Sequence, residues 1–209
     1  MAHDGEKVKG AEYMKVHNVV INECDAKDNA FGLHEFVQRA IRDFCIDMMN
    51  ELIEIREATL LKRYMELWNN FKTYTLSLNK LFAYLNRYHL KNMATKSISE
   101  ECMCTFKKET WTPVKELLQQ ATMQAIEADR NKEEINRQAI RDIIQSYKDM
   151  GLITPTVRLE DGRIVWHGVK NYSIYVESYE QAFLEHTRRN YAQKAGQWVL
   201  EFNAIEYIN

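Results

Sequence analysis

A short run of tyrosine and arginine is the feature of this sequence with the clearest chemical capacity. The apolar seam of the surrounding helical pattern passes through Phe82 and Leu85, which leaves Tyr84, Arg87 and Tyr88 partly outside it. Tyrosine and arginine dominate many protein interfaces, because each combines a large contact area with polar groups. The run therefore predicts a binding surface. The alternative is a solvated helix end, where an arginine is favourable next to the C-terminal dipole.

Catalytic patterns are missing from the sequence. Six histidines are scattered along the chain, with no pair at i, i+4 and no H-E-x-x-H, so no metal site is predicted. No glycine-rich phosphate loop and no G-x-S-x-G motif occur. Glu133 and Glu134 form a carboxylate pair, but they lie in a polar stretch before a predicted helix and indicate a solvated turn. We expect neither an enzyme nor a bound cofactor.

Charge and cysteine content narrow the class of protein further. The net charge is −2 with mixed signs, and no basic block indicates a nucleic-acid partner. No apolar stretch approaches the roughly 18 residues of a membrane span, and the first ten residues do not resemble a signal peptide. Cys102 and Cys104 are two apart, which suits neither a zinc knuckle nor a redox pair. Reduced, structural thiols indicate a reducing compartment, the cytoplasm and nucleus.

The elements that must position these residues are predicted to be long helices. Only two prolines and seven glycines interrupt 209 residues, and apolar side chains recur in steps of three and four. Asn136 is a favourable N-cap, and Gly151 is placed to end the helix that follows. Pro113 either ends one helix or occupies the first turn of the next. Helical patterns cover 11–24, 34–57, 59–90, 99–129, 136–150 and 173–200, with a polar linker at 92–99.

Residues 156–166 depart from this helical pattern. Val157 and Leu159 alternate with polar residues, and so do Ile164 and Trp166 after the pair Asp161-Gly162. Asp-Gly between alternating segments is a type I′ turn signal, so a small β-hairpin is predicted. Because a two-stranded hairpin is weak alone, it must pack against the helices. The predicted fold is all-α, made of elongated helical bundles with one hairpin.

Four ordered segments resemble the cullin family. YLNRYHL at 84–90 resembles the Y-L-N/D-R signature of an early cullin helix, and EYMKVHNVVINEC at 12–24 resembles the second helix of the first cullin repeat. The stretch 125–152 is similar to the segment I-x-x-x-R-x-G-E-x-I-N with its following helix. The stretch 175–201 is similar to Y-x-x-x-F-E-x-x-F-L-x-x-T-x-x-Y-Y. The resemblance covers about residues 11–209.

The resemblance implies a non-catalytic scaffold of a ubiquitin ligase. Cullin stalks are built from helical repeats and bind a substrate-receptor adaptor, and this sequence most resembles the class found in SCF ligases. That class implies a Skp-family adaptor with F-box proteins as partners. The positions that match the family's adaptor-facing residues are Tyr13, Val16, His17 and Val20 on the short helix and Tyr84, Arg87 and Tyr88 on the long one.

The resemblance also implies a division of the chain. Residues 1–10 would be a polar, flexible N-terminus, 11–98 most of a first cullin repeat that binds the adaptor, and 99–209 part of a second repeat. Because the sequence stops within that repeat, we expect no RING partner for this chain alone. It is then either a fragment of a longer cullin or a short cullin-like decoy that occupies the adaptor. The alternative function is a helical tethering or trafficking scaffold unrelated to ubiquitin.

Several positions depart from the family pattern. His17 and Ile21 replace aromatic residues, which predicts a weaker or altered adaptor contact. Lys132 occupies the family's glycine, and the 156–166 hairpin is an insertion. Only about ten polar residues precede Glu12, so the first stalk helix, which helps to hold the F-box protein in the family, is expected to be missing.

Overall fold

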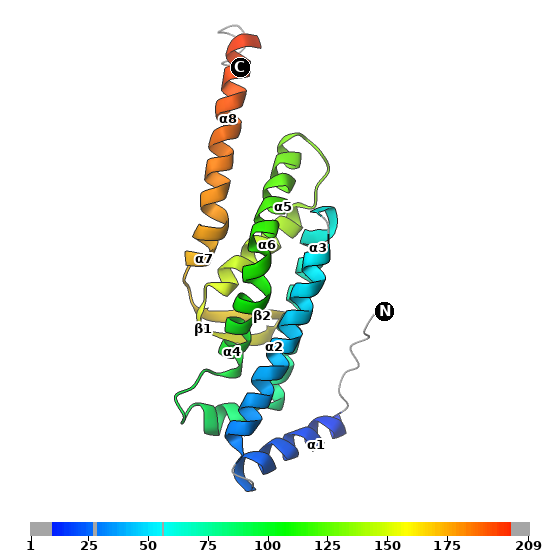
Figure 1. The fold of residues 1–209 in the computed structure, drawn as a ribbon, viewed down its shortest axis with the longest axis vertical. Coiled ribbons are helices and arrows are strands. Elements are labelled where there is room, and N and C mark those ends of the chain that lie inside the picture. Colours follow the sequence, from blue (N-terminus) through cyan, green and yellow to red (C-terminus); the bar gives the residue numbers. More distant parts are fainter. Residues whose placement is uncertain (1–9, 27–28, 56, 202–209) are drawn as a thin grey trace.

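The computed structural model describes residues 10–26, 29–55 and 57–201, and within them the chain forms an elongated stack of helices with one hairpin (Figure 1). The prediction of an all-α fold with a single small hairpin is confirmed. Residues 1–9 of the predicted flexible N-terminus lie outside the described residues. The elements are α1 (Gly10–Ile21), α2 (Ala30–Glu54), α3 (Glu57–Leu81), α4 (Ile98–Thr105), α5 (Thr112–Arg130), α6 (Arg137–Met150), β1 (Ile153–Glu160), β2 (Arg163–Val169), α7 (Ser173–Tyr175) and α8 (Gln181–Glu201), with π-helical segments η1 (Asn22–Ala26), η2 (Leu85–Leu90), η3 (Phe106–Trp111) and η4 (Val176–Glu180).

Helix α3 runs through the middle of the stack and packs against α2, α4, α5 and α6. Its inward side is largely aromatic: Trp68 and Phe71 are buried, and both lie against Phe106 of η3 at centroid distances of 5.0 and 4.5 Å. Tyr64 is also buried, and its hydroxyl is 3.1 Å from the Ser146 hydroxyl of α6, so its polar atom has a partner. The aromatic seam thus forms the bundle core that the sequence predicted.

The helix boundaries follow local capping chemistry, with one correction to the predicted linker at 92–99. α4 begins at Ile98, inside that linker, because Ser97 and Glu100 form a capping box: the Glu100 amide donates to Ser97 Oγ, and the Ser97 amide donates to Glu100 Oε2. Asn136 caps α6 as predicted, since its side chain accepts from the Ala139 amide at 3.1 Å. Pro113 lies in the first turn of α5.

Gly151 ends α6 as predicted, and its backbone is not in the left-handed conformation that often favours glycine at a helix end. Its φ is −77°, which any residue adopts. A Cβ atom at this position would lie 2.0 Å from the Asn171 carbonyl oxygen, so glycine is required by the close approach of the chain that leads into α7.

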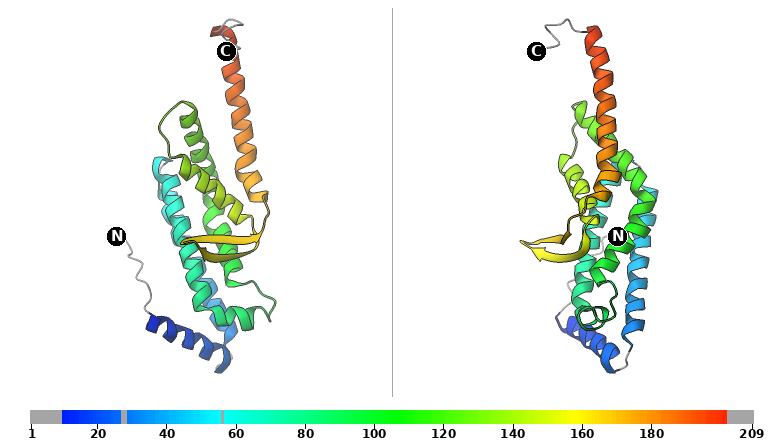
Figure 2. Two further views of the ribbon diagram at one scale, coloured as in Figure 1. Left: turned by 180° about the vertical axis from the view of Figure 1, so that it is seen from behind. Right: turned by 90° about the vertical axis from the view of Figure 1, so that its left-hand side faces the viewer.

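The hairpin forms as predicted and is longer than 156–166. Asp161 and Gly162 both have positive φ, 47° and 75°, as a type I′ turn requires. Val157 and Trp166 face each other across the strands and are both buried, with the Trp166 ring 6.1 Å from Phe71. Trp166 therefore anchors the hairpin to α3, while its tip projects from the side of the helices (Figure 2).

The last helical run, α7 through α8, begins beside the hairpin and extends beyond the upper end of the stack in Figure 1. Tyr175, Tyr179 and Phe183 lie along one side of it, with the ring centroids of neighbouring pairs 5.7 and 5.5 Å apart. Side chains at the end of α5 hold the middle of α8: Arg130 lies 3.0 Å from His186 Nδ1 and donates to the Thr187 hydroxyl at 2.5 Å.

Candidate functional site

The two predicted adaptor-facing segments lie at the same end of the molecule, where α1 crosses the end of α3 (Figure 1). The Tyr13 hydroxyl donates to the Lys80 carbonyl oxygen at 2.8 Å, and the His17 ring stacks on Tyr13 with centroids 6.0 Å apart. Val20 is only 2% exposed and belongs to the core. The stripe of Tyr13, His17 and Val20 is therefore the side of α1 that packs on the bundle.

This packing corrects one of the predicted surface residues. Val20 cannot contact a partner in this conformation, because its side chain is covered by the rest of the chain. An amphipathic stripe marks the side that becomes buried, and in α1 that side faces the bundle. Val16 lies at the edge of the stripe and is 39% exposed.

A polar cluster joins the end of α1 to η2. Asp25, in η1, accepts a hydrogen bond from the Tyr84 hydroxyl, and its other carboxylate oxygen lies 3.3 Å from His89 Nε2. The bond to Asp25 raises the pKa of Tyr84 to about 12, because a phenolate would lose that bond and face a carboxylate. Tyr84 thus positions α1 relative to the end of the α3 run, in addition to any contact with a partner.

Arg87 and Tyr88 have the exposure that a docking residue needs. Tyr88 is 50% exposed and packs against Tyr84 with centroids 4.8 Å apart, which restricts its ring. Arg87 is exposed, and its side chain has no hydrogen bond or ion pair with any residue in the part of the chain that the structure describes. Among the predicted residues, Val16, Arg87 and Tyr88 are the most accessible, and their role in adaptor binding stays a prediction.

Sequence reasoning missed several large apolar side chains that are exposed at this end. Met14 and Val19 of α1 are 53% and 58% exposed, and Phe31 and Phe36 at the start of α2 are 61% and 60% exposed. Apolar residues that fall outside a helix's main stripe were the available signal, since such positions are normally polar. We call Met14, Val16, Val19, Arg87 and Tyr88 the α1–η2 surface.

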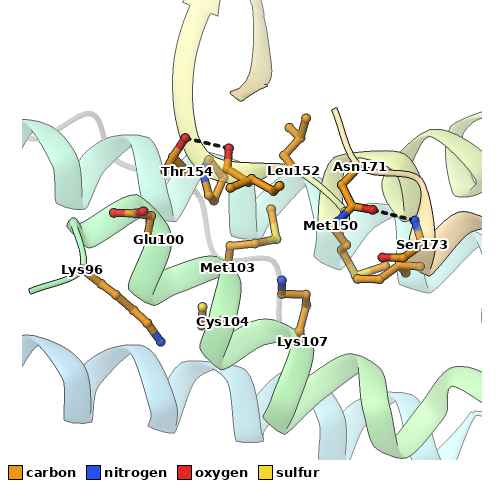
Figure 3. A pocket seen from close by; sticks show the side chains of 14 residues that line it. Lys96, Glu100, Met103, Cys104, Lys107, Met150, Leu152, Thr154, Asn171 and Ser173 are labelled. Carbon is orange, nitrogen blue, oxygen red and sulfur yellow. Dashed lines mark hydrogen bonds between the residues drawn. The ribbon is translucent and has the colours of Figure 1, made fainter. Parts of the chain in front are cut away.

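Metal-ligand groups and thiols are the other features of the described chain that could carry chemistry. No group of three or more histidine, cysteine, aspartate or glutamate side chains within 10–26, 29–55 and 57–201 is placed to hold a metal ion. Burial raises the pKa of Cys45 and Cys102 to about 12, which disfavours reactive thiolates. Cys104 lines a groove of about 290 Å³ between α4 and the start of β1, where Lys96 and Lys107 flank it (Figure 3).

The helices also show no membrane-spanning segment: across the residues described, none combines the length and apolar character that a bilayer crossing requires. Fold and exposed surface together define an elongated helical protein with large apolar side chains exposed at one end. Comparison of the sequence with known proteins agrees with such a helical protein and identifies its family. The sequence matches the cullin family, described as "Cullin alpha solenoid domain", over residues 2–209, so the chain belongs to the cullin family.

Similarity to individual relatives is modest and extends over most of the chain. A putative cullin-like protein 2 from Arabidopsis thaliana is 22% identical over 95% of this chain and 50% of its own length. Cullin-1 from Oryza sativa subsp. japonica is 23% identical over 68% of this chain and 20% of its own length. Cell division control protein 53 from Saccharomyces cerevisiae is 20% identical over 94% and 25%. The chain spans half or less of these three relatives.

Proposed function

We propose that this chain is a non-catalytic, adaptor-binding part of a cullin-type ubiquitin-ligase scaffold, acting in the cytoplasm and nucleus. Its partner would be a Skp-family adaptor carrying F-box proteins. The observation that carries the proposal is the α1–η2 surface, where exposed apolar side chains of α1 and the exposed Arg87 and Tyr88 of η2 lie at the same end of a cullin-family fold.

The chemistry of the surface suits such a contact. Met14 and Val19 provide apolar area on α1, and Tyr88 adds an aromatic ring with a polar tip. Arg87 is free to form a charge-assisted hydrogen bond with a carboxylate of the adaptor. Interfaces with central aromatic and arginine residues concentrate their binding free energy in those residues. No feature of the described residues favours the tethering alternative.

Titration calorimetry of the purified chain with a Skp-family adaptor tests the proposal. We expect Tyr88→Ala or Arg87→Ala to weaken binding by about 2 kcal/mol, roughly 30-fold. Tyr191→Ala is the matched control, because Tyr191 is 58% exposed but lies on α8. The absence of a complex, or equal weakening by Tyr191→Ala, would count against the proposal.

Tyr84 requires two variants, because it both contacts Asp25 and lies within the predicted surface. Tyr84→Phe removes only the hydroxyl that holds Asp25, whereas Tyr84→Ala also removes the ring. If the ring contacts the adaptor, Tyr84→Ala weakens binding well beyond Tyr84→Phe. If both variants weaken it equally, Tyr84 acts by positioning α1.

A further inference from the structure

The two outer edges of the hairpin differ, and the β1 edge is blocked. Pro155 has no backbone N–H, and the pairing is irregular between Ile153 and Thr156. Thr154 lies within this irregularity with a φ of 49°, which bends the strand. Helix α4 runs alongside, with Met103 directed toward the start of β1 (Figure 3). These features are the means by which proteins prevent an edge strand from pairing.

The β2 edge has none of these obstructions. In a hairpin with a two-residue turn the flanking residues, here Glu160 and Arg163, form a hydrogen-bonded pair, and the pairs alternate from there. Ile164 and Trp166 occupy non-hydrogen-bonded positions, so their N–H and C=O groups point to the outer edge. Neither residue's backbone bonds to another backbone or side chain among the described residues outside the hairpin.

A groove runs along this open edge. Its first part, of about 830 Å³, is lined by Gly162 of the turn, by residues 163–165 of β2, by α6 and by α3. Its second part, of about 320 Å³, is lined by residues 166–168 and the end of α6. Gln145 and Asp149 of α6 line both parts, so the two adjoin and together form a groove between β2 and α6.

The charges around the groove favour an acidic occupant. Four cationic side chains line it, against the two carboxyl groups of Asp142 and Asp149. Burial raises the pKa of Asp149 to about 6, so its negative charge is lost below that pH. A second copy of β2 is unsuited, because it would bring further basic groups of its own. The four cations are Lys72, Lys148, Arg163 and Lys170.

We propose that the outer edge of β2 binds an acidic, extended segment of a partner protein as an added third strand. The outward N–H and C=O groups of Ile164 and Trp166 would supply main-chain hydrogen bonds, as in other strand-addition complexes. The lysines and arginine of the groove would select acidic side chains. This surface is distinct from the α1–η2 surface, so either can fail without the other.

Fluorescence anisotropy of the full chain with a labelled peptide in which glutamate and valine alternate tests this proposal. Ile164→Pro removes one outward N–H from the β2 edge, and Leu159→Pro removes the equivalent N–H from β1 on the same rung of the hairpin. We expect saturable binding that Ile164→Pro weakens at least tenfold and that Leu159→Pro leaves within twofold. A lysine–valine peptide should bind at least tenfold more weakly.

Three results would overturn the proposal. One is no saturable binding at millimolar peptide, and another is equal binding of the acidic and basic peptides. The third is a concentration-dependent dimer abolished by Ile164→Pro, which would make a second copy the occupant. Circular dichroism establishes that both proline variants fold. If Ile164→Pro does not, Arg163→Glu with Lys170→Glu replaces it, with the same tenfold loss expected and unchanged affinity counting against the proposal.

Discussion

Asp149 provides a test of how the groove beside β2 is built. It lies in the last turn of α6, where its carboxylate accepts a hydrogen bond from Gln145 Nε2 at 2.8 Å. Burial raises its pKa from 3.8 to about 6, against the opposing effects of Gln145 and Lys72. The folded state thus disfavours the ionised carboxylate, and Asp149→Asn should stabilise the protein at neutral pH.

The magnitude and its pH dependence follow from this shift. Each pKa unit corresponds to about 1.4 kcal/mol, so the shift sets an upper limit of roughly 3 kcal/mol. Because solvent enters the groove, we expect a gain of about 1–2 kcal/mol for Asp149→Asn. Below about pH 4 the carboxyl is protonated in both states and the gain vanishes. It grows as the pH rises to about 6, where the folded state also ionises, and is constant above that.

Urea unfolding monitored by circular dichroism over this pH range measures the effect. Asp142→Asn is the matched control, because Asp142 accepts from Gln138 with the same i, i+4 spacing at 2.8 Å on the same helix. The excess of Asp149→Asn over Asp142→Asn isolates the contribution of burial. A difference between the variants that stays constant from about pH 4 to 7, or a loss of stability at neutral pH, would refute the reasoning.

Three further substitutions test the fold. Lys132→Gly should raise the free energy of unfolding, measured by urea titration, by about 1 kcal/mol, because Lys132 has a φ of 65° and a side chain strains the backbone in this region. Unchanged or lower stability would contradict this strain. Trp166→Ala should lower the free energy of unfolding by about 3 kcal/mol or more, measured by thermal unfolding. Val169→Ala is the control and should lower it by less than about 0.5 kcal/mol, because Val169 is 64% exposed. Similar losses for the two variants would show that Trp166 does not anchor the hairpin. Gly151→Ala should lower the free energy of unfolding by about 2 kcal/mol or more in the same assay, because the alanine Cβ would clash with the Asn171 carbonyl oxygen. Unchanged stability would mean that the chain at Asn171 moves aside without loss.

Elements with strong local signals were predictable from the sequence. Asp161-Gly162 between alternating apolar residues determined the hairpin, and Asn136 marked the start of α6. The capping box of Ser97 and Glu100 was also present as S-x-x-E but lay within a polar stretch, where it was overlooked. The departure at Lys132 is informative in the same way, since Lys132 stands where the family pattern has glycine and its φ is positive in this chain.

The surface was less predictable, because a periodic pattern shows that one side of a helix is apolar but not what covers it. On α1 the stripe of Tyr13 and Val20 matched the family's adaptor-facing positions, yet in this chain it packs on α3. The bond from Tyr84 to Asp25 spans 59 positions, and no local pattern encodes such a contact. The division into repeats at residue 98 stays a prediction.

The central claim is that the α1–η2 surface binds a Skp-family adaptor. Hydrogen exchange measured by mass spectrometry, on the chain alone and with saturating adaptor, tests it without altering any residue. The account predicts that amide protection increases in α1 and η2 while residues 188–198 of α8 keep their exchange rates. Increased protection confined to α8 or to the hairpin, or none at saturating adaptor, would contradict it.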